Sequence, residues 1–170
     1  MGVLYLLRHA KAQMALPGQR DFDRPLAEIG VEQSVDLGGR MDEAGYRPAL
    51  VLCSPALRTR QTLDGVRRSL AIADEDTRFK ADLFGGDATS YLGEIRAHGD
   101  AGALMIVGHN PMIEDVACAL AGKNGDPAAL HRLMGGVPVA ALAVIAFDDG
   151  FASAAPGSGR LLAFLTPGDE

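Results

Sequence analysis

The chain has few of the features that several protein classes require. It holds only two cysteines among 170 residues, so a disulfide framework is not what stabilises its fold. Its 16 basic residues are outnumbered by 22 acidic ones, and a formal net charge of −6 gives no overall attraction to nucleic acid or to an anionic membrane. No hydrophobic run approaches the length of a membrane span. The length and a charged fraction of 22% predict a single globular domain over residues 1–170.

The N-terminal residues also lack the marks of a targeting segment. No basic region precedes the first apolar run, which Arg8 interrupts, so we expect no cleaved signal peptide. Leu6 stands where a myristoylation motif carries a hydroxyl residue. Cys53 and Cys118 lie among apolar neighbours, which is typical of reduced, buried thiols. These features together predict a cytoplasmic protein.

Short apolar runs without alternation indicate strands that are buried on both faces, as in a parallel sheet. Such runs occupy 3–7, 49–53 and 103–108, and two further strands are predicted at 141–147 and 160–165. Helical segments are predicted at 27–44, 55–71, 88–98 and 112–121. Strands that alternate with helices predict an α/β three-layer sandwich, with a mostly parallel central sheet flanked by helices.

The first predicted helix contains an unusual pair of glycines. Its apolar positions at spacings of three and four predict a buried face made of Val31, Val35, Gly38 and Met41. Gly38 and Gly39 weaken this helix by up to about 1 kcal/mol each. A close approach to a neighbouring element would explain why they are there.

The next helices begin with clear start signals. Ser54 is the predicted N-cap of the second helix, with Pro55 at its first position. Asn110 and Pro111 repeat this arrangement before the helix at 112–121. Each start signal follows directly on a predicted strand.

Polar side chains follow three of the predicted strands, at the edge of the sheet where α/β proteins bind ligands. They are Arg8 with His9, then Ser54 to Arg58, and finally His109 with Asn110. Taken alone, Arg8 and His9 also fit a strand that has simply reached water, and His109 also fits a helix cap or a core-edge residue. Two arginines and two helix N-termini together favour a compact, multiply charged anion, and a phosphoryl group matches guanidinium geometry.

The two histidines suggest a reaction at such a phosphoryl group. One of them can attack phosphorus through a ring nitrogen and form a phosphohistidine. The other can stabilise the transferring oxygens beside the arginines. A two-histidine metal hydrolase is a weaker alternative, because the clustered ligand spacing of such sites is missing.

Three segments resemble the signature motifs of the histidine phosphatase superfamily, which has the phosphoglycerate mutase-like fold. They are RHA at 8–10, SPALRTRQT at 54–62 and GHNP at 108–111. DRPL at 23–26, Gly30 and the short chain resemble the small phosphohistidine phosphatase branch, called SixA-type. The resemblance continues through GGVPVAALAVIAFD and LLAFLTP and so covers nearly the whole chain.

The resemblance implies a metal-independent phosphatase without a cofactor. His9 would be the nucleophile that becomes phosphorylated, Arg8 and Arg58 the phosphate clamps, and His109 the second histidine of the pocket. The implied substrate is a phosphohistidine on a protein, for example a histidine phosphotransfer domain. A small phosphomonoester and a phosphate-binding module without catalysis are the alternatives.

The acid that would protonate the leaving group is the weakest part of the resemblance. Related proteins use a carboxylate after the second motif, usually a glutamate, and this chain offers Asp82 first and Asp87 second. Each can equally be a solvated loop aspartate. An imidazole leaving group has a conjugate-acid pKa of about 6.5, so a phosphohistidine substrate needs less help from an acid than an alkoxide does.

Several residues near the motifs have open or peripheral roles. Lys11 and Ala12 stand where related proteins often carry a hydroxyl residue, so one phosphate hydrogen bond is missing or is supplied by Lys11. Arg24 either reaches the rim of the pocket or forms a structural ion pair. We expect surface positions for three further residues, namely Arg60, His98 and His131.

Overall fold

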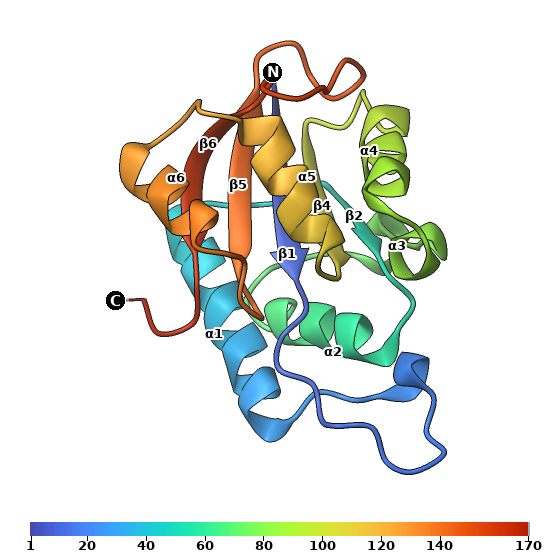
Figure 1. Ribbon diagram of the computed structural model, residues 1–170. Coiled ribbons are helices and arrows are strands. Elements are labelled where there is room, and N and C mark those ends of the chain that lie inside the picture. Colours follow the sequence, from blue (N-terminus) through green and yellow to red (C-terminus); the bar gives the residue numbers. More distant parts are fainter. Residues whose placement is uncertain (170) are drawn as a thin grey trace.

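The computed structural model describes residues 1–169 and contains one six-stranded sheet covered by helices on both faces (Figure 1). The strand order is β3-β2-β4-β1-β5-β6. The strands are β1 (Gly2–Arg8), β2 (Leu50–Cys53), β3 (Thr77–Phe79), β4 (Ala103–Gly108), β5 (Leu142–Phe147) and β6 (Arg160–Leu165). The helices are α1 (Glu28–Ala44), α2 (Leu57–Val66), α3 (Asp82–Gly85), α4 (Ala88–Ala97), α5 (Met112–Ala121) and α6 (Pro127–Met134), with 3-10 turns η1 (Asp21–Asp23) and η2 (Asp74–Asp76).

The sheet is mostly parallel, as predicted. β3, β2, β4 and β1 are paired in parallel, whereas β5 is antiparallel to β1 and to β6. β1 lies between β4 and β5, and its residues Leu4 to Leu7 are buried while Val3 is half-buried, which confirms the strand predicted from the run VLYLL. The carboxyl ends of β1, β2 and β4 therefore lie at one edge of the sheet.

Successive residues of each strand point to opposite faces of the sheet and divide the core into two layers. Leu4 and Leu6 of β1 pack with residues of α3, α4, α5 and α6. Tyr5 and Leu7 pack on the other face, with residues of α1 and α2. This arrangement confirms the three-layer α/β sandwich.

The predicted buried face of α1 is partly wrong. Val31 is exposed and Val35 is only half-buried, whereas Gly30, Ser34, Leu37, Gly38 and Met41 are buried. Small residues are buried here because α1 and α2 pack with their backbones close together. A Cβ atom on Gly38 would lie 2.6 Å from the carbonyl oxygen of Val66, at the end of α2. The close approach inferred for Gly38 is thus confirmed.

Most element bounds agree with the predicted ones to within two residues. The main exception is α2, which begins at Leu57 and ends at Val66 instead of spanning 55–71. Its N-cap residue is Ala56, so the predicted cap at Ser54 is wrong. The helix α6 at Pro127–Met134 was not predicted, although Asp126 and Pro127 supply an N-cap and a first-turn proline.

Two surface assignments also need correction. Cys53 is buried as predicted, but Cys118 is exposed, because Val116, Ala117 and Leu120 occupy the buried face of α5. His98 is buried rather than exposed. His98 is the residue after α4. Its ring Nδ1 hydrogen-bonds to the Glu94 carbonyl at 2.8 Å, and its Nε2 lies 3.2 Å from Arg78 Nη1. Arg60 and His131 are exposed, as predicted.

The two glycines of α1 give a direct test of its packing. Gly39→Ala places a methyl group near only the Ser69 hydroxyl, 3.9 Å away, and should gain up to about 1 kcal/mol of helix stability. Gly38→Ala meets backbone of α2 and should lower the free energy of unfolding by about 1 to 3 kcal/mol. Urea unfolding of both variants measures the difference. Equal stabilities for the two variants would contradict the close packing of α1 on α2.

Candidate active site

The pairing of β1 with β4 brings two histidines together at the edge of the sheet. Arg8, the last residue of β1, stands opposite Gly108, the last residue of β4. The next backbone N–H, that of His9, donates to the Gly108 carbonyl at 3.0 Å. The rings of His9 and His109 consequently lie side by side, with centroids 5.3 Å apart.

His9 has a defined tautomer in this arrangement. Its side chain is buried, and Nδ1 lies 2.7 Å from the carbonyl oxygen of Ala10. A carbonyl only accepts, so Nδ1 carries the proton and Nε2 keeps its lone pair. Ala10 is itself fixed, because its N–H donates to the Thr62 hydroxyl at 3.0 Å. Nε2 is thus the basic and nucleophilic atom of the His9 ring.

Burial and positive neighbours keep this ring neutral. Burial, together with the charges of Arg58, Arg8 and Arg24, lowers the pKa of His9 to about 4, and the hydrogen bond to Ala10 opposes this shift. At neutral pH the ring is therefore an uncharged base in a positively charged pocket. That state is required of a histidine that attacks a phosphorus atom.

His109 is held by groups from two other elements. Its Nε2 and the Ser54 hydroxyl are 2.8 Å apart, and its backbone N–H donates to the Tyr91 hydroxyl at 3.1 Å. Tyr91, in α4, donates in turn to the Leu83 carbonyl at 2.5 Å. The ring of Phe84 meets the His109 ring edge to face, with centroids 5.7 Å apart. Ser54, predicted as a helix cap, instead orients this histidine.

The pKa of His109 is lowered even more than that of His9. Burial lowers it to about 3, and the Arg58 charge acts in the same direction. Both rings are therefore neutral near pH 7. The positive charge of the pocket belongs to the arginines alone.

Arg58 is the buried cation of the site. It is the second residue of α2, and only 6% of it is exposed. Its Nη1 donates to the Asp21 carbonyl at 2.8 Å and its Nη2 to Asp21 Oδ2 at 3.0 Å. The other oxygen of the same carboxylate lies 3.1 Å from Arg24 Nε. The structural ion pair considered for Arg24 is thus present, and its charge also reaches His9.

Asp21 is the carboxylate that sequence reasoning missed. It lies in η1, in the loop between β1 and α1 that projects at the lower right of Figure 1. Its side chain is 60% exposed although it contacts the buried Arg58. The only signal in the sequence was its position three residues before Arg24, and nothing in that spacing pointed to Arg58.

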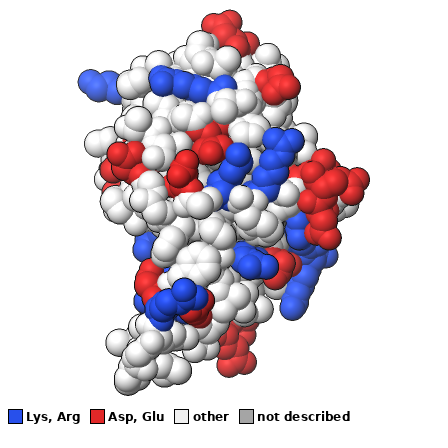
Figure 2. All heavy atoms as spheres, turned by 90° about the vertical axis from the view of Figure 1, so that its right-hand side faces the viewer, with Lys and Arg blue, Asp and Glu red and all other residues white. Residues whose placement is uncertain are grey.

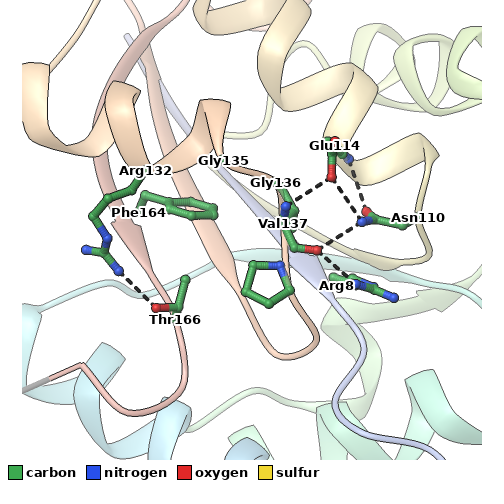
Figure 3. A pocket seen from close by; sticks show the side chains of 10 residues that line it. Arg8, Asn110, Glu114, Arg132, Gly135, Gly136, Val137, Phe164 and Thr166 are labelled. Carbon is green, nitrogen blue, oxygen red and sulfur yellow. Dashed lines mark hydrogen bonds between the residues drawn. The ribbon is translucent and has the colours of Figure 1, made fainter.

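Arg8 precedes His9 in the chain and is half-buried at the end of β1. Its Nη1 donates to the Val137 carbonyl at 2.8 Å. The side chain also lines a cavity of about 560 Å³ together with Glu114, Arg132, Phe164 and others (Figure 3). The charges of Arg8 and Arg58 both act on the adjacent rings of His9 and His109, so these four predicted residues meet at one edge of the sheet.

The two candidate acids lie outside this group. Asp87 is exposed and is the N-cap of α4, where its side chain accepts from the Ser90 N–H at 2.9 Å and this bond lowers its pKa. Asp82 is the exposed first residue of α3. Within residues 1–169, no hydrogen bond or ion pair joins either side chain to the arginines or histidines of the site. A structural role is therefore observed for Asp87, and none for Asp82.

Charge is otherwise mixed over the surface. On the face shown in Figure 2, Lys and Arg side chains lie interspersed with Asp and Glu. Lys11 is exposed, and its backbone N–H donates to Gln33. Residues 1–169 contain no cluster of three His, Cys, Asp or Glu side chains suited to a metal ion. They also contain no helix that could cross a membrane.

The lowered pKa values predict how stability depends on pH. Between about pH 4 and 6.5 the unfolded chain binds protons that the folded histidines reject, so stability falls as the pH is lowered through this window. Each buried histidine should remove about 2 kcal/mol between pH 7 and pH 5. In His109→Asn, the free energy of unfolding should fall by about 2 kcal/mol less over this pH range than in wild type. Urea unfolding in a buffer without phosphate measures it. Parallel curves for variant and wild type would contradict the neutral, buried ring.

Known proteins resemble this chain over almost its full length. A family model described as "Histidine phosphatase superfamily (branch 1)" matches residues 4–83. An uncharacterized protein of Mycobacterium tuberculosis is 34% identical over 166 residues, which cover 95% of this chain and 99% of that protein. These matches include the motifs around His9 and Arg58.

Solved structures agree with the sequence matches. A protein of Agrobacterium tumefaciens assigned as phosphohistidine phosphatase SixA is 35% identical, with a TM-score of 0.82 and 98% of each chain covered. A second structure assigned as SixA, from Nakamurella multipartitia, is 31% identical with a TM-score of 0.80, covering 99% of this chain and 97% of that one. With its paired histidines and arginines at the carboxyl edge of this sheet, the chain belongs to the histidine phosphatase superfamily.

Proposed function

We propose that the protein is a phosphatase that transfers a phosphoryl group to His9 and then to water. The observation that carries this proposal is the state of His9. Its proton is held at Nδ1 by the Ala10 carbonyl, its ring is neutral, and it lies among the charges of Arg58 and Arg8. A nucleophile of this kind needs no further base to activate it.

In the first step, the Nε2 lone pair of His9 attacks phosphorus and forms a P–N bond. The bond from phosphorus to the leaving group breaks, and its electron pair goes to the leaving group. Arg8 and Arg58 balance the charge on the phosphoryl oxygens, and His109 adds a neutral contact beside them. In the second step, water attacks phosphorus, the P–N bond breaks, and inorganic phosphate leaves.

The contact between Asp21 and Arg58 favours binding of a doubly charged phosphoryl group. The backbone carbonyl and the carboxylate of Asp21 each accept one hydrogen bond from Arg58, at N–H groups that a phosphoryl group would use, and the Asp21 side chain is largely exposed. A bound phosphoryl group replaces one negative partner by a more highly charged one. The buried guanidinium then stays paired throughout, which avoids an uncompensated charge in the interior.

We propose phosphohistidine on a protein as the substrate, for example on a histidine phosphotransfer domain. Support comes from the two similar structures assigned as SixA and from Asp82 and Asp87, whose side chains make no hydrogen bond or ion pair with the arginines and histidines of the site within residues 1–169. An imidazole leaves more readily than an alkoxide because its conjugate acid has a pKa of about 6.5. The alternatives are a small phosphomonoester and phosphate binding without catalysis.

Replacement of the nucleophile tests the mechanism. His9→Ala should abolish hydrolysis of p-nitrophenyl phosphate, by at least about a thousandfold, because the covalent route is lost. Wild-type protein should show a burst of p-nitrophenol and acid-labile phosphate on His9. The exposed His131 serves as a control, and His131→Ala should keep full activity. An active His9→Ala variant would exclude the phosphohistidine mechanism, and wild type without any turnover would favour the binding module.

The choice of leaving group separates the candidate acids and the substrate classes. Asp21→Asn and Asp82→Asn are each assayed with an alkyl phosphate and with a phosphohistidine protein. Loss of a general acid should lower the alkyl phosphate rate by about a hundredfold or more and spare the phosphohistidine rate.

We expect the variant that shows this contrast to identify the acid. Asp82 is the acid candidate that the family motif implies, and Asp21 is the candidate that contacts Arg58. Asp87→Asn is the matched control, since that carboxylate caps α4. A wild-type rate that is higher on small phosphomonoesters than on the phosphoprotein, at equal concentration, would overturn the proposed substrate.

A further inference from the structure

The loop between α6 and β5 contributes the backbone C=O and N–H groups of Val137 to the phosphate site. The Val137 carbonyl accepts from Arg8 Nη1 at 2.8 Å and from Asn110 Nδ2 at 2.9 Å. The Val137 N–H, on the other side of the same residue, donates to Glu114 Oε2 at 3.0 Å (Figure 3). Val137 thus connects the guanidinium of Arg8 to a carboxylate on α5.

Glu114 and Asn110 hold each other as well. Glu114 Oε2 lies 3.3 Å from Asn110 Nδ2, and the Glu114 N–H donates to Asn110 Oδ1 at 3.3 Å. Glu114 lies in the first turn of α5, which begins at Met112, two residues after Asn110. The same turn is linked to the second histidine, because the Ile113 N–H donates to the His109 carbonyl at 2.9 Å.

The loop needs such an anchor because of its sequence. Gly135 and Gly136 precede Val137 and have no side chains that pack, and Gly136 has a φ of 109°. Glycines at such positions cost more conformational entropy to order than other residues do. A carboxylate that accepts the Val137 N–H fixes the peptide orientation that this flexible pair leaves open.

Arg8 in turn needs the loop. The cavity of about 560 Å³ lies beside its side chain, with Arg132, Phe164 and Thr166 on the far wall (Figure 3). A guanidinium on a flexible stem can turn into a space of that size. The hydrogen bond to Val137 holds Nη1 and leaves the remaining N–H groups in a fixed orientation for an anion.

We propose that Glu114 is a positioning residue of the phosphate site: through the backbone of Val137 and the side chain of Asn110 it fixes the guanidinium of Arg8 in its anion-binding orientation. The inference rests on the proposed function, in which Arg8 is a phosphate clamp. Glu114 acts without touching the phosphoryl group. It lowers the ordering cost of binding because the clamp is already in place before the ligand arrives.

Electrostatics act in the same direction. Burial lowers the pKa of Arg8, and the negative charge of Glu114 opposes that shift. Glu114 has no ion-pair partner within 4 Å among residues 1–169, so its charge stays available to the guanidinium. Hydrogen bonding and charge therefore both favour a fixed, protonated Arg8.

Binding of inorganic phosphate, measured by calorimetry, tests the proposal without turnover. Glu114→Ala and Glu114→Asp each break the contact with the Val137 N–H and should weaken phosphate binding about tenfold. Glu114→Gln should stay within about threefold of wild type, since its carbonyl oxygen accepts the same two hydrogen bonds. Asp115→Asn, the exposed neighbour on α5, is the matched control and should bind as wild type does. Melting temperatures confirm that each variant is folded.

Kinetics with p-nitrophenyl phosphate give a readout that a merely structural role would not move. The KM of Glu114→Ala should rise about tenfold with a smaller change in kcat. Arg8 would bind the phosphoryl group in the ground state and in the transition state, so a weaker Arg8 contact affects both. In an Arg8→Ala background the same substitution should change phosphate affinity less than twofold, since Glu114 acts through Arg8.

Three results would overturn the proposal. They are unchanged phosphate affinity in folded Glu114→Ala or Glu114→Asp, a Glu114→Gln variant as weak as Glu114→Ala, and equal effects of Glu114→Ala with and without Arg8. If wild type binds phosphate with this pattern but turns over no substrate, catalysis fails and the positioning role stands. If wild type binds no phosphate, both fail.

Discussion

The pairing of β1 with β4 is the constraint on which the site depends. Its parallel register sets Arg8 opposite Gly108, and the hydrogen bond from the His9 N–H to the Gly108 carbonyl continues it by one residue. A shift of one residue would turn each side chain to the opposite face of the sheet. The register that packs Leu4 and Leu6 on one face of the sheet and Tyr5 and Leu7 on the other therefore also places the two histidines.

Burial and nearby cations together set the charge states around His9 and His109. Both imidazoles are neutral because they are desolvated and surrounded by guanidinium groups. The arginines stay paired, Arg58 with Asp21 and Arg8 with the Val137 carbonyl. The site thus combines uncharged imidazole rings with the positive charge of the neighbouring arginines. It does so in a protein whose net charge is −6.

Local sequence patterns predicted the positions of most helices and strands well, and the faces with which they pack less well. The strand ends and the helix at 112–121 follow from apolar runs and start signals. The buried face of α1 could not be predicted in this way. Close backbone contact with α2 favours Ser34 and Gly38 over Val31 at the buried positions, and hydrophobicity alone cannot indicate this. Cys118 was misplaced because apolar sequence neighbours do not specify a helix face. The cytoplasmic location stays a prediction from the sequence.

The sequence by itself determined the fold class and the family, because short buried strands and motifs at their ends are local signals. The same signals indicated that Arg8, His9, Arg58 and His109 lie at one edge of the sheet. Only the tertiary structure decided what surrounds them. Asp21 on Arg58, Ser54 on His109 and Glu114 behind Val137 join segments far apart in the chain. Such contacts depend on how the loops return to the edge of the sheet, and no spacing within one segment encodes that.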